Sequence, residues 1–156
     1  MERFKIFTGE NLSIQKYLET WRLDNMLFEE KDKISKKTAL EWFEYSNRST
    51  IVLWNMEKDC LIGYITPFLM KHDFASKYLI SEKTYKEALK KNSFAKPSSD
   101  VSADIYIFST VVVDEYRDTI MTSDTSSVFY GKSAFKVLNE ALVDWVCYIK
   151  RKRGFN

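Results

Sequence analysis

The segment from Asp104 to Val113, DIYIFSTVVV, constrains the fold more than any other part of the chain. Its second half is apolar on both faces, a pattern typical of a strand that is covered on both sides. We therefore expect it to be the central strand of a sheet that is flanked by helices. A small, polar stretch from Asp118 to Ser127 follows it, and then a long amphipathic helix from about Lys132 to Lys152.

Local patterns predict the remaining elements. They are a strand at 3–7, a helix starting at Asn11, a helix capped by Ser35, a hairpin of 50–54 with 60–69, and a short helix at 82–91. Pro67 has no N–H to donate, so we expect the second hairpin strand either to be near its end there or to lie at a sheet edge. Strands and helices within 156 residues predict a single α+β domain over residues 1–156.

Composition excludes several classes of protein. The chain is 45% hydrophobic and 29% charged, and its net charge of +2 gives no general field for attracting nucleic acid or anionic membrane. No run approaches the roughly 20 apolar residues of a membrane span, and the N-terminal apolar stretch is too short for a signal peptide, so we expect a cytoplasmic protein. Two distant cysteines are expected to be free thiols, and a single histidine, His72, excludes a histidine-rich metal site.

Three segments together resemble a known family. They are LIGYI at 61–65, STVVVDEYRD at 109–118 and YGKSAFKVLNEAL at 130–142. With the order strand, helix, helix, hairpin, long strand, loop and long helix, they resemble the GCN5-related N-acetyltransferase (GNAT) family. The resemblance implies an acyl-CoA N-acyltransferase-like fold, α+β (α/β), with a mixed sheet flanked by helices, and acetyl-CoA as co-substrate.

The resemblance also implies where the coenzyme binds. Val111, Val112 and Val113 align with the strand that pairs with the pantetheine arm, and Tyr130, Gly131, Lys132 and Ser133 align with the loop that receives the pyrophosphate. Backbone groups at a splayed strand and at a helix N-terminus suit these two tasks. The sequence departs from the family in two respects: about ten residues, 118–127, intervene before the loop, and one of its two glycines is kept.

The family domain continues beyond the long helix with further strands and a helix, which often supply a tyrosine that acts as general acid. This sequence ends at Asn156, so we expect a C-terminally incomplete version of the fold. Three explanations stay open: a truncated copy, a domain that ends differently, or strand exchange with a second subunit. An open strand edge favours association more than a complete sheet would, so a homodimer that completes the sheet is one candidate assembly.

Acetyl transfer requires a base for the acceptor amine and needs no covalent nucleophile. Asp104 and Glu115, near the valine-rich strand, are the candidates, although a strand-opening aspartate is also a common turn residue. We therefore expect an acetyl-CoA-dependent N-acetyltransferase that acts on a primary amine of a small molecule or protein. The alternative is an inactive acetyltransferase-like binding or self-associating module. An RNA-binding protein using Lys150–Arg153 ranks last, because those residues complement the helix dipole without a partner.

Overall fold

The computed structural model describes residues 2–74, 89–98 and 102–154. Its strands are β1 (Phe4–Phe7), β2 (Ile51–Asn55), β3 (Cys60–Lys71) and β4 (Ala103–Val112). Its α-helices are α1 (Ile14–Leu27), α2 (Lys36–Tyr45) and α5 (Ala134–Lys152), and its 3₁₀ turns are η1 (Gly9–Asn11), η2 (Glu30–Asp32), η3 (Lys91–Ser93) and η4 (Asp114–Tyr116). The predicted α+β class is confirmed.

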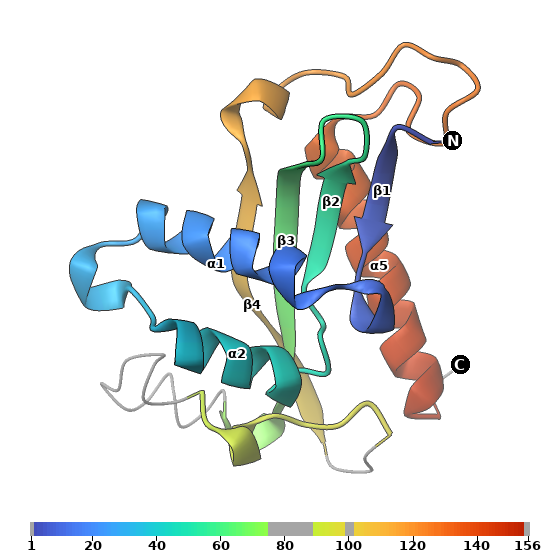
Figure 1. Cartoon of the computed structure of the whole chain (residues 1–156). Coiled ribbons are helices and arrows are strands. Elements are labelled where there is room, and N and C mark those ends of the chain that lie inside the picture. Colours follow the sequence, from blue (N-terminus) through green and yellow to red (C-terminus); the bar gives the residue numbers. More distant parts are fainter. Residues whose placement is uncertain (1, 75–88, 99–101, 155–156) are drawn as a thin grey trace.

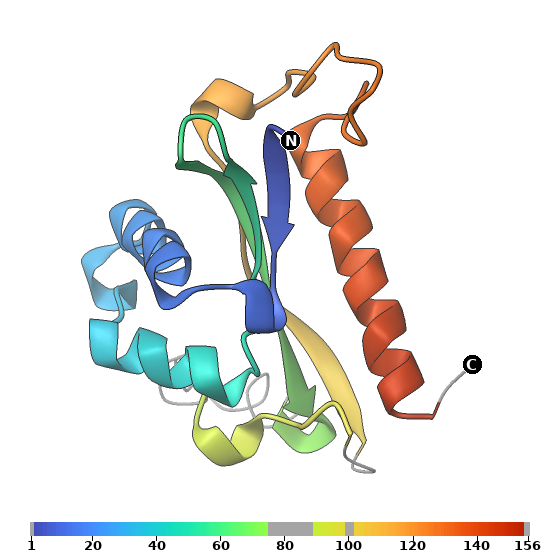
Figure 2. The same ribbon diagram turned by 45° about the vertical axis from the view of Figure 1, so that its right-hand side comes forward.

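The strands form one sheet in chain order, β1-β2-β3-β4, in which each neighbouring pair is antiparallel (Figure 1). A mixed sheet was expected, but the described part of the chain contains only antiparallel pairs. Figure 2 shows the layers: α1 and α2 cover one face of the sheet and α5 covers the other. Each face has its own apolar core, one centred on Trp42, Phe43 and Phe68, and the other on Ile62, Ile65 and Leu138.

The three α-helices begin in the same way. The hydroxyl oxygens of Ser13, Ser35 and Ser133 each accept a hydrogen bond from the amide three residues later, which satisfies one of the unpaired N–H groups of the first turn. The predicted cap Ser35 is confirmed. Asn11 was expected to cap α1, but it belongs to η1, so the helix starts later, after Ser13.

The position of β4 differs from the prediction. Among the described residues, β4 pairs only with β3, so it is an edge strand of the sheet and not its centre. The apolar side chains that suggested two covered faces are in part exposed: Ile105 and Ile107 are 39% and 41% accessible. The reason is that α5 packs chiefly against β2 and β3 and reaches β4 only near its two ends, at Ala103 and Val112.

The expectation for Pro67 is confirmed in part. β3 continues to Lys71, so Pro67 is not its end, but the pairing with β2 stops at Ile65, and at Pro67 β3 pairs with β4 alone. A bulge between Thr66 and Pro67 changes the pairing with β4, and Pro67 then faces Ile107. Because this pair exchanges no hydrogen bonds, the missing N–H of proline disturbs neither strand.

The predicted helix at 82–91 falls largely on residues 75–88, which lie outside the described residues. Where the description resumes, Lys91–Ser93 forms η3, and Phe94 then bridges to Met70 of β3. In the part of the chain that the structure describes, no helix is both long enough and apolar enough to cross a membrane.

Candidate functional site

The predicted coenzyme strand presents one of its three valines to the open edge of the sheet. The amide of Val113 donates to the carbonyl of Ile62 at 2.9 Å, and peptide groups alternate in direction along an antiparallel strand. Val111 and Val113 therefore direct their peptide groups toward β3, whereas Val112 and Thr110 direct theirs outward. The outward carbonyl of Val112 accepts a hydrogen bond from Nε of Arg117 at 3.1 Å.

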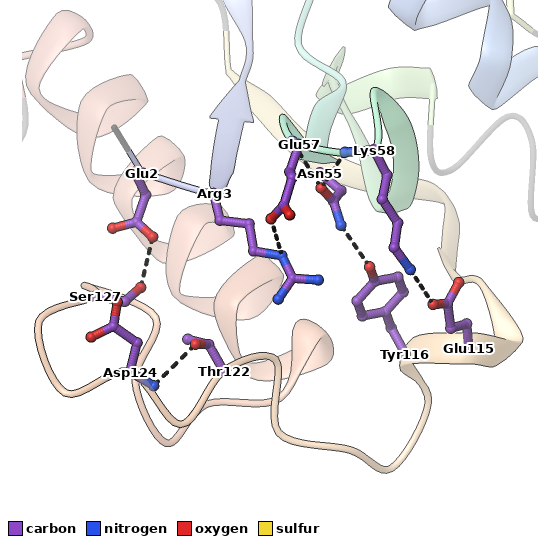
Figure 3. Close-up of polar contacts among 10 residues, drawn as sticks. All are labelled: Glu2, Arg3, Asn55, Glu57, Lys58, Glu115, Tyr116, Thr122, Asp124 and Ser127. Atoms are coloured by element: carbon purple, nitrogen blue, oxygen red, sulfur yellow. Dashed lines mark hydrogen bonds and ion pairs between the residues drawn. The ribbon is translucent and has the colours of Figure 1, made fainter.

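The ten-residue insertion predicted between β4 and the coenzyme loop is packed onto the protein. Met121 and Phe129 are buried in the core beneath α5, and the ring of Phe129 meets that of Phe4 edge-on at 6.0 Å. The hydroxyl of Ser127 donates to the Glu2 carboxylate at 2.8 Å (Figure 3). These contacts fasten the end of the loop to the start of the chain and to β1.

The four predicted loop residues, 130–133, lie together at the start of α5. The amides of Tyr130 and Lys132 donate to loop carbonyls at 3.2 and 3.1 Å, so they are already engaged. The amide of Gly131 has no partner among the described residues. Gly131 has φ +70°, a conformation that favours glycine, and a Cβ added there would meet no atom within 4 Å.

The surroundings of this helix start are suited to an anion beside an aromatic group. The first turn of α5 contains no acidic residue, so no carboxylate opposes the positive end of the helix dipole. Tyr130 and Phe135 flank the turn and are 52% and 54% exposed. The ammonium of Lys132 pairs with Glu140 at 2.7 Å.

Asp104, one of the two predicted bases, lies far from this junction. It pairs with Met70 at the beginning of β4, whereas Val111 pairs with Tyr64 near its end. Seven residues of strand separate Asp104 from Val111, a distance of about 23 Å. Its carboxylate contacts Nδ1 of His72 at 2.9 Å, and both side chains are exposed. The structure therefore does not bring Asp104 to the predicted coenzyme site.

Glu115, the other predicted base, lies in η4 at the correct end of β4 but faces away from the cores. Its carboxylate accepts from Nζ of Lys58 at 2.9 Å, and this hydrogen bond raises the pKa of the lysine (Figure 3). Beside it, Nδ2 of Asn55 donates to the buried hydroxyl of Tyr116 at 2.8 Å. Glu115 thus takes part in the contacts that hold η4 to the β2–β3 turn.

A carboxylate that sequence reasoning missed lies on the other side of the same strand pair. Asp24 is only 4% exposed, in the last turn of α1, between the helix and the sheet. Its Oδ1 accepts a hydrogen bond from the hydroxyl of Tyr64 at 2.6 Å, and its Oδ2 accepts one from Ser109 at 3.4 Å. A signal existed in the sequence, because the apolar stripe at 14, 17, 18 and 21 continues to position 24.

Burial raises the pKa of Asp24 from its ordinary 3.8 to about 6, against the two hydroxyl hydrogen bonds, which lower it. The carboxylate also lies near the C-terminus of α1, where the helix dipole disfavours negative charge. Among the described residues no Lys, Arg or His side chain pairs with it. Asp24 is therefore a buried carboxylate that is stabilised by two hydroxyls and by no cation.

No family model, curated protein or solved structure matches this chain. Function is therefore proposed from the geometry of the site, together with the resemblance of its motifs.

Proposed function

We propose that this protein is an acetyl-CoA-dependent N-acetyltransferase with an acyl-CoA N-acyltransferase-like fold, which transfers an acetyl group to a primary amine of a small molecule or protein. One observation carries the proposal: β4 ends at an open edge of the sheet with the peptide of Val112 directed outward, and the helix that follows, α5, begins without acidic residues in its first turn. Val112 and Ala134 both belong to the apolar core beneath α5.

Each part of the coenzyme has a matching group. Extended pantetheine can pair with outward backbone groups at Thr110 and Val112, as an added strand does. The pyrophosphate suits the amide of Gly131 and the positive end of α5, and the adenine ring suits an exposed aromatic such as Tyr130 or Phe135. Nε of Arg117 now donates to the carbonyl of Val112. For pantetheine to bind, the guanidinium must leave this carbonyl and donate to the ligand instead.

The test is a calorimetric titration with acetyl-CoA of the wild-type chain and two variants. Gly131→Asp places a carboxylate at the proposed phosphate site, whereas Gly154→Asp makes the same change at the other end of α5. The two glycines are matched, with φ of +70° and +80° and open space around an added Cβ. We expect binding to be lost in Gly131→Asp alone. Equal affinity in both variants would reject the assigned site, and no binding by the wild-type chain would reject the function.

A second candidate is a self-associating module in which a second copy pairs with the outer edge of β4. It is favoured by the exposed Ile105 and Ile107, whose side chains lie on the face that α5 leaves open. The amide of His72 donates to the carbonyl of Ser102, so the peptide group of Ser102 points toward β3. Because peptide groups alternate in direction along an antiparallel strand, those of Ile105 and Ile107 point outward. Two such edges, related by a twofold axis, would pair as antiparallel strands and bury these side chains.

The mass in solution tests this candidate. Ile107→Lys places a charge at the edge and should convert a dimer into a monomer. Met56→Lys, in the β2–β3 turn, introduces the same charge at a side chain of similar exposure, 38% against 41%. The candidate predicts that only the edge variant dissociates. A monomeric wild-type chain at high concentration would reject it.

A further inference from the structure

We infer that Asp24 accepts the proton of the acceptor amine, with the hydroxyl of Ser109 as the relay between them. This inference rests on the proposed acetyltransferase function and names the base and the substrate class of the same site. The acceptor is then a primary amine that is protonated at neutral pH, and it approaches the sheet from the side covered by α1.

The position of the cluster supports this role. Tyr64 pairs with Val111 across β3 and β4, and Ser109 precedes Val111 by two residues, or about 7 Å of strand. Asp24 therefore lies over the part of β4 that would carry the pantetheine arm, unlike Asp104. Ser109 is half-buried, whereas Asp24 is almost fully covered, so of the two residues the serine is the more accessible to a ligand.

The groups around Asp24 indicate which kind of ligand group would stabilise its charge. The groups that face it are the hydroxyl of Tyr64 from β3, that of Ser109 from β4, and Tyr17 from α1 itself, whose pKa is raised by burial and then by Asp24. None of these groups is cationic. A carboxylate in such surroundings is stabilised by the positive charge of an ammonium group bound at Ser109, which donates a hydrogen bond to the serine hydroxyl.

The proton transfer can be written so that atoms and charges balance. The ammonium gives one proton to Oγ of Ser109 while the serine proton moves to Oδ2 of Asp24, which becomes a neutral acid. The free amine then attacks the thioester carbonyl carbon, a C–N bond forms and the C–S bond breaks. The second proton of the attacking nitrogen goes to the leaving thiolate, and Asp24 returns its proton to solvent. The products are the amide, coenzyme A thiol and one proton.

A purely structural role explains the arrangement less well. A carboxylate that only joined α1 to the sheet would be replaced without loss by a neutral side chain of the same shape, because burial and the helix dipole both oppose its charge. A titrating carboxylate at a position where ionisation is disfavoured is characteristic of functional sites. The two roles differ in what happens to activity when the charge is removed.

The experiment compares Asp24→Asn with Asp144→Asn, a matched change at an exposed position of α5. Thiol release from acetyl-CoA is followed from pH 5 to 9 with spermidine and with a lysine-containing peptide as probe amines, and acetyl-CoA binding is measured by calorimetry. We expect Asp24→Asn to bind acetyl-CoA normally and to lose roughly 10²- to 10⁴-fold in kcat. The wild-type rate should fall as pH decreases through about 6, the pKa of Asp24, and this dependence should vanish in the variant.

Tyr64→Phe gives a readout that a structural role would not change. It removes a hydrogen bond that lowers the pKa of Asp24, so the acidic limb of the pH–rate profile should move to higher pH. Coenzyme binding with a wild-type rate and pH profile in Asp24→Asn would overturn this inference and leave the proposed function intact. A wild-type chain that neither binds acetyl-CoA nor acetylates either probe would overturn both.

Discussion

The hydroxyl of Tyr64 donates a 2.6 Å hydrogen bond to Oδ1 of Asp24, which joins the middle of β3 to the last turn of α1. Burial, and then the charge of Asp24, raise the pKa of Tyr64, so its hydroxyl keeps its proton and acts as the donor. The bond crosses the layer between helix and sheet at its centre. A neutral aspartic acid there would satisfy the same geometry, which makes the stability of the protein sensitive to the protonation of one group.

Asp24→Asn should raise the stability of the protein at neutral pH. The pKa of Asp24 in the folded chain, about 6, lies above its ordinary value of 3.8, so its stabilising effect is complete below pH 4 and is lost as pH rises through 6. The difference between the two pKa values corresponds to a loss of roughly 3 kcal/mol in the free energy of unfolding at pH 7. Urea unfolding at pH 7 should therefore show a free energy of unfolding that is greater in the variant by up to that amount, with the difference shrinking toward pH 4.

Asp144→Asn is the control, because Asp144 is exposed on α5 and should change stability little at either pH. A loss of stability in Asp24→Asn at pH 7 would show that the charge itself holds α1 on the sheet.

Tyr116→Phe should destabilise the protein by about 1–3 kcal/mol, because the buried Nδ2 of Asn55 would lose its acceptor. Oδ1 of Asn55 also accepts the amides of Glu57 and Lys58, so the same side chain shapes the β2–β3 turn (Figure 3). Thermal or urea unfolding measures the change. Tyr130→Phe removes a hydroxyl from an exposed ring and should have almost no effect, and equal effects of the two variants would contradict the role of the Asn55 contact.

Gly63→Ala should destabilise the β3–β4 pair by about 1–3 kcal/mol, since an added Cβ would lie 2.7 Å from the carbonyl oxygen of Val111 and 3.1 Å from Leu138. The carbonyl of Val111 can retreat only if β4 moves, whereas the methyl of Leu138 can move by rotation of its side chain. The measurement is the free energy of unfolding, with Gly9→Ala as comparison, where φ is +60° and no atom lies near. A smaller loss in Gly63→Ala than in Gly9→Ala would show that the strand pair is not close-packed there.

Much of the secondary structure could be predicted because its determinants are local. The hairpin, the cap at Ser35 and the long helix ending before Gly154 follow from β-branched runs, a serine before an apolar stripe and a glycine of positive φ. Local signals did not settle how strands are arranged in the sheet. The apolar run in β4 matched both an internal strand and an edge strand with uncovered isoleucines, and the difference depends on what packs beside it.

Some residues of the candidate site could be predicted from local sequence, and others could not. Gly131 and the valines could be picked out from the sequence because the task proposed for them depends on backbone freedom and strand propensity. Tyr64 and Ser109, on two strands, follow Asp24 of α1 by 40 and 85 residues, and no local pattern links the three. The sequence by itself determined which segments are strands and helices and where the backbone can turn. Only the tertiary structure decided which carboxylate is buried beside β4, because desolvation and pairing arise from contacts between distant segments.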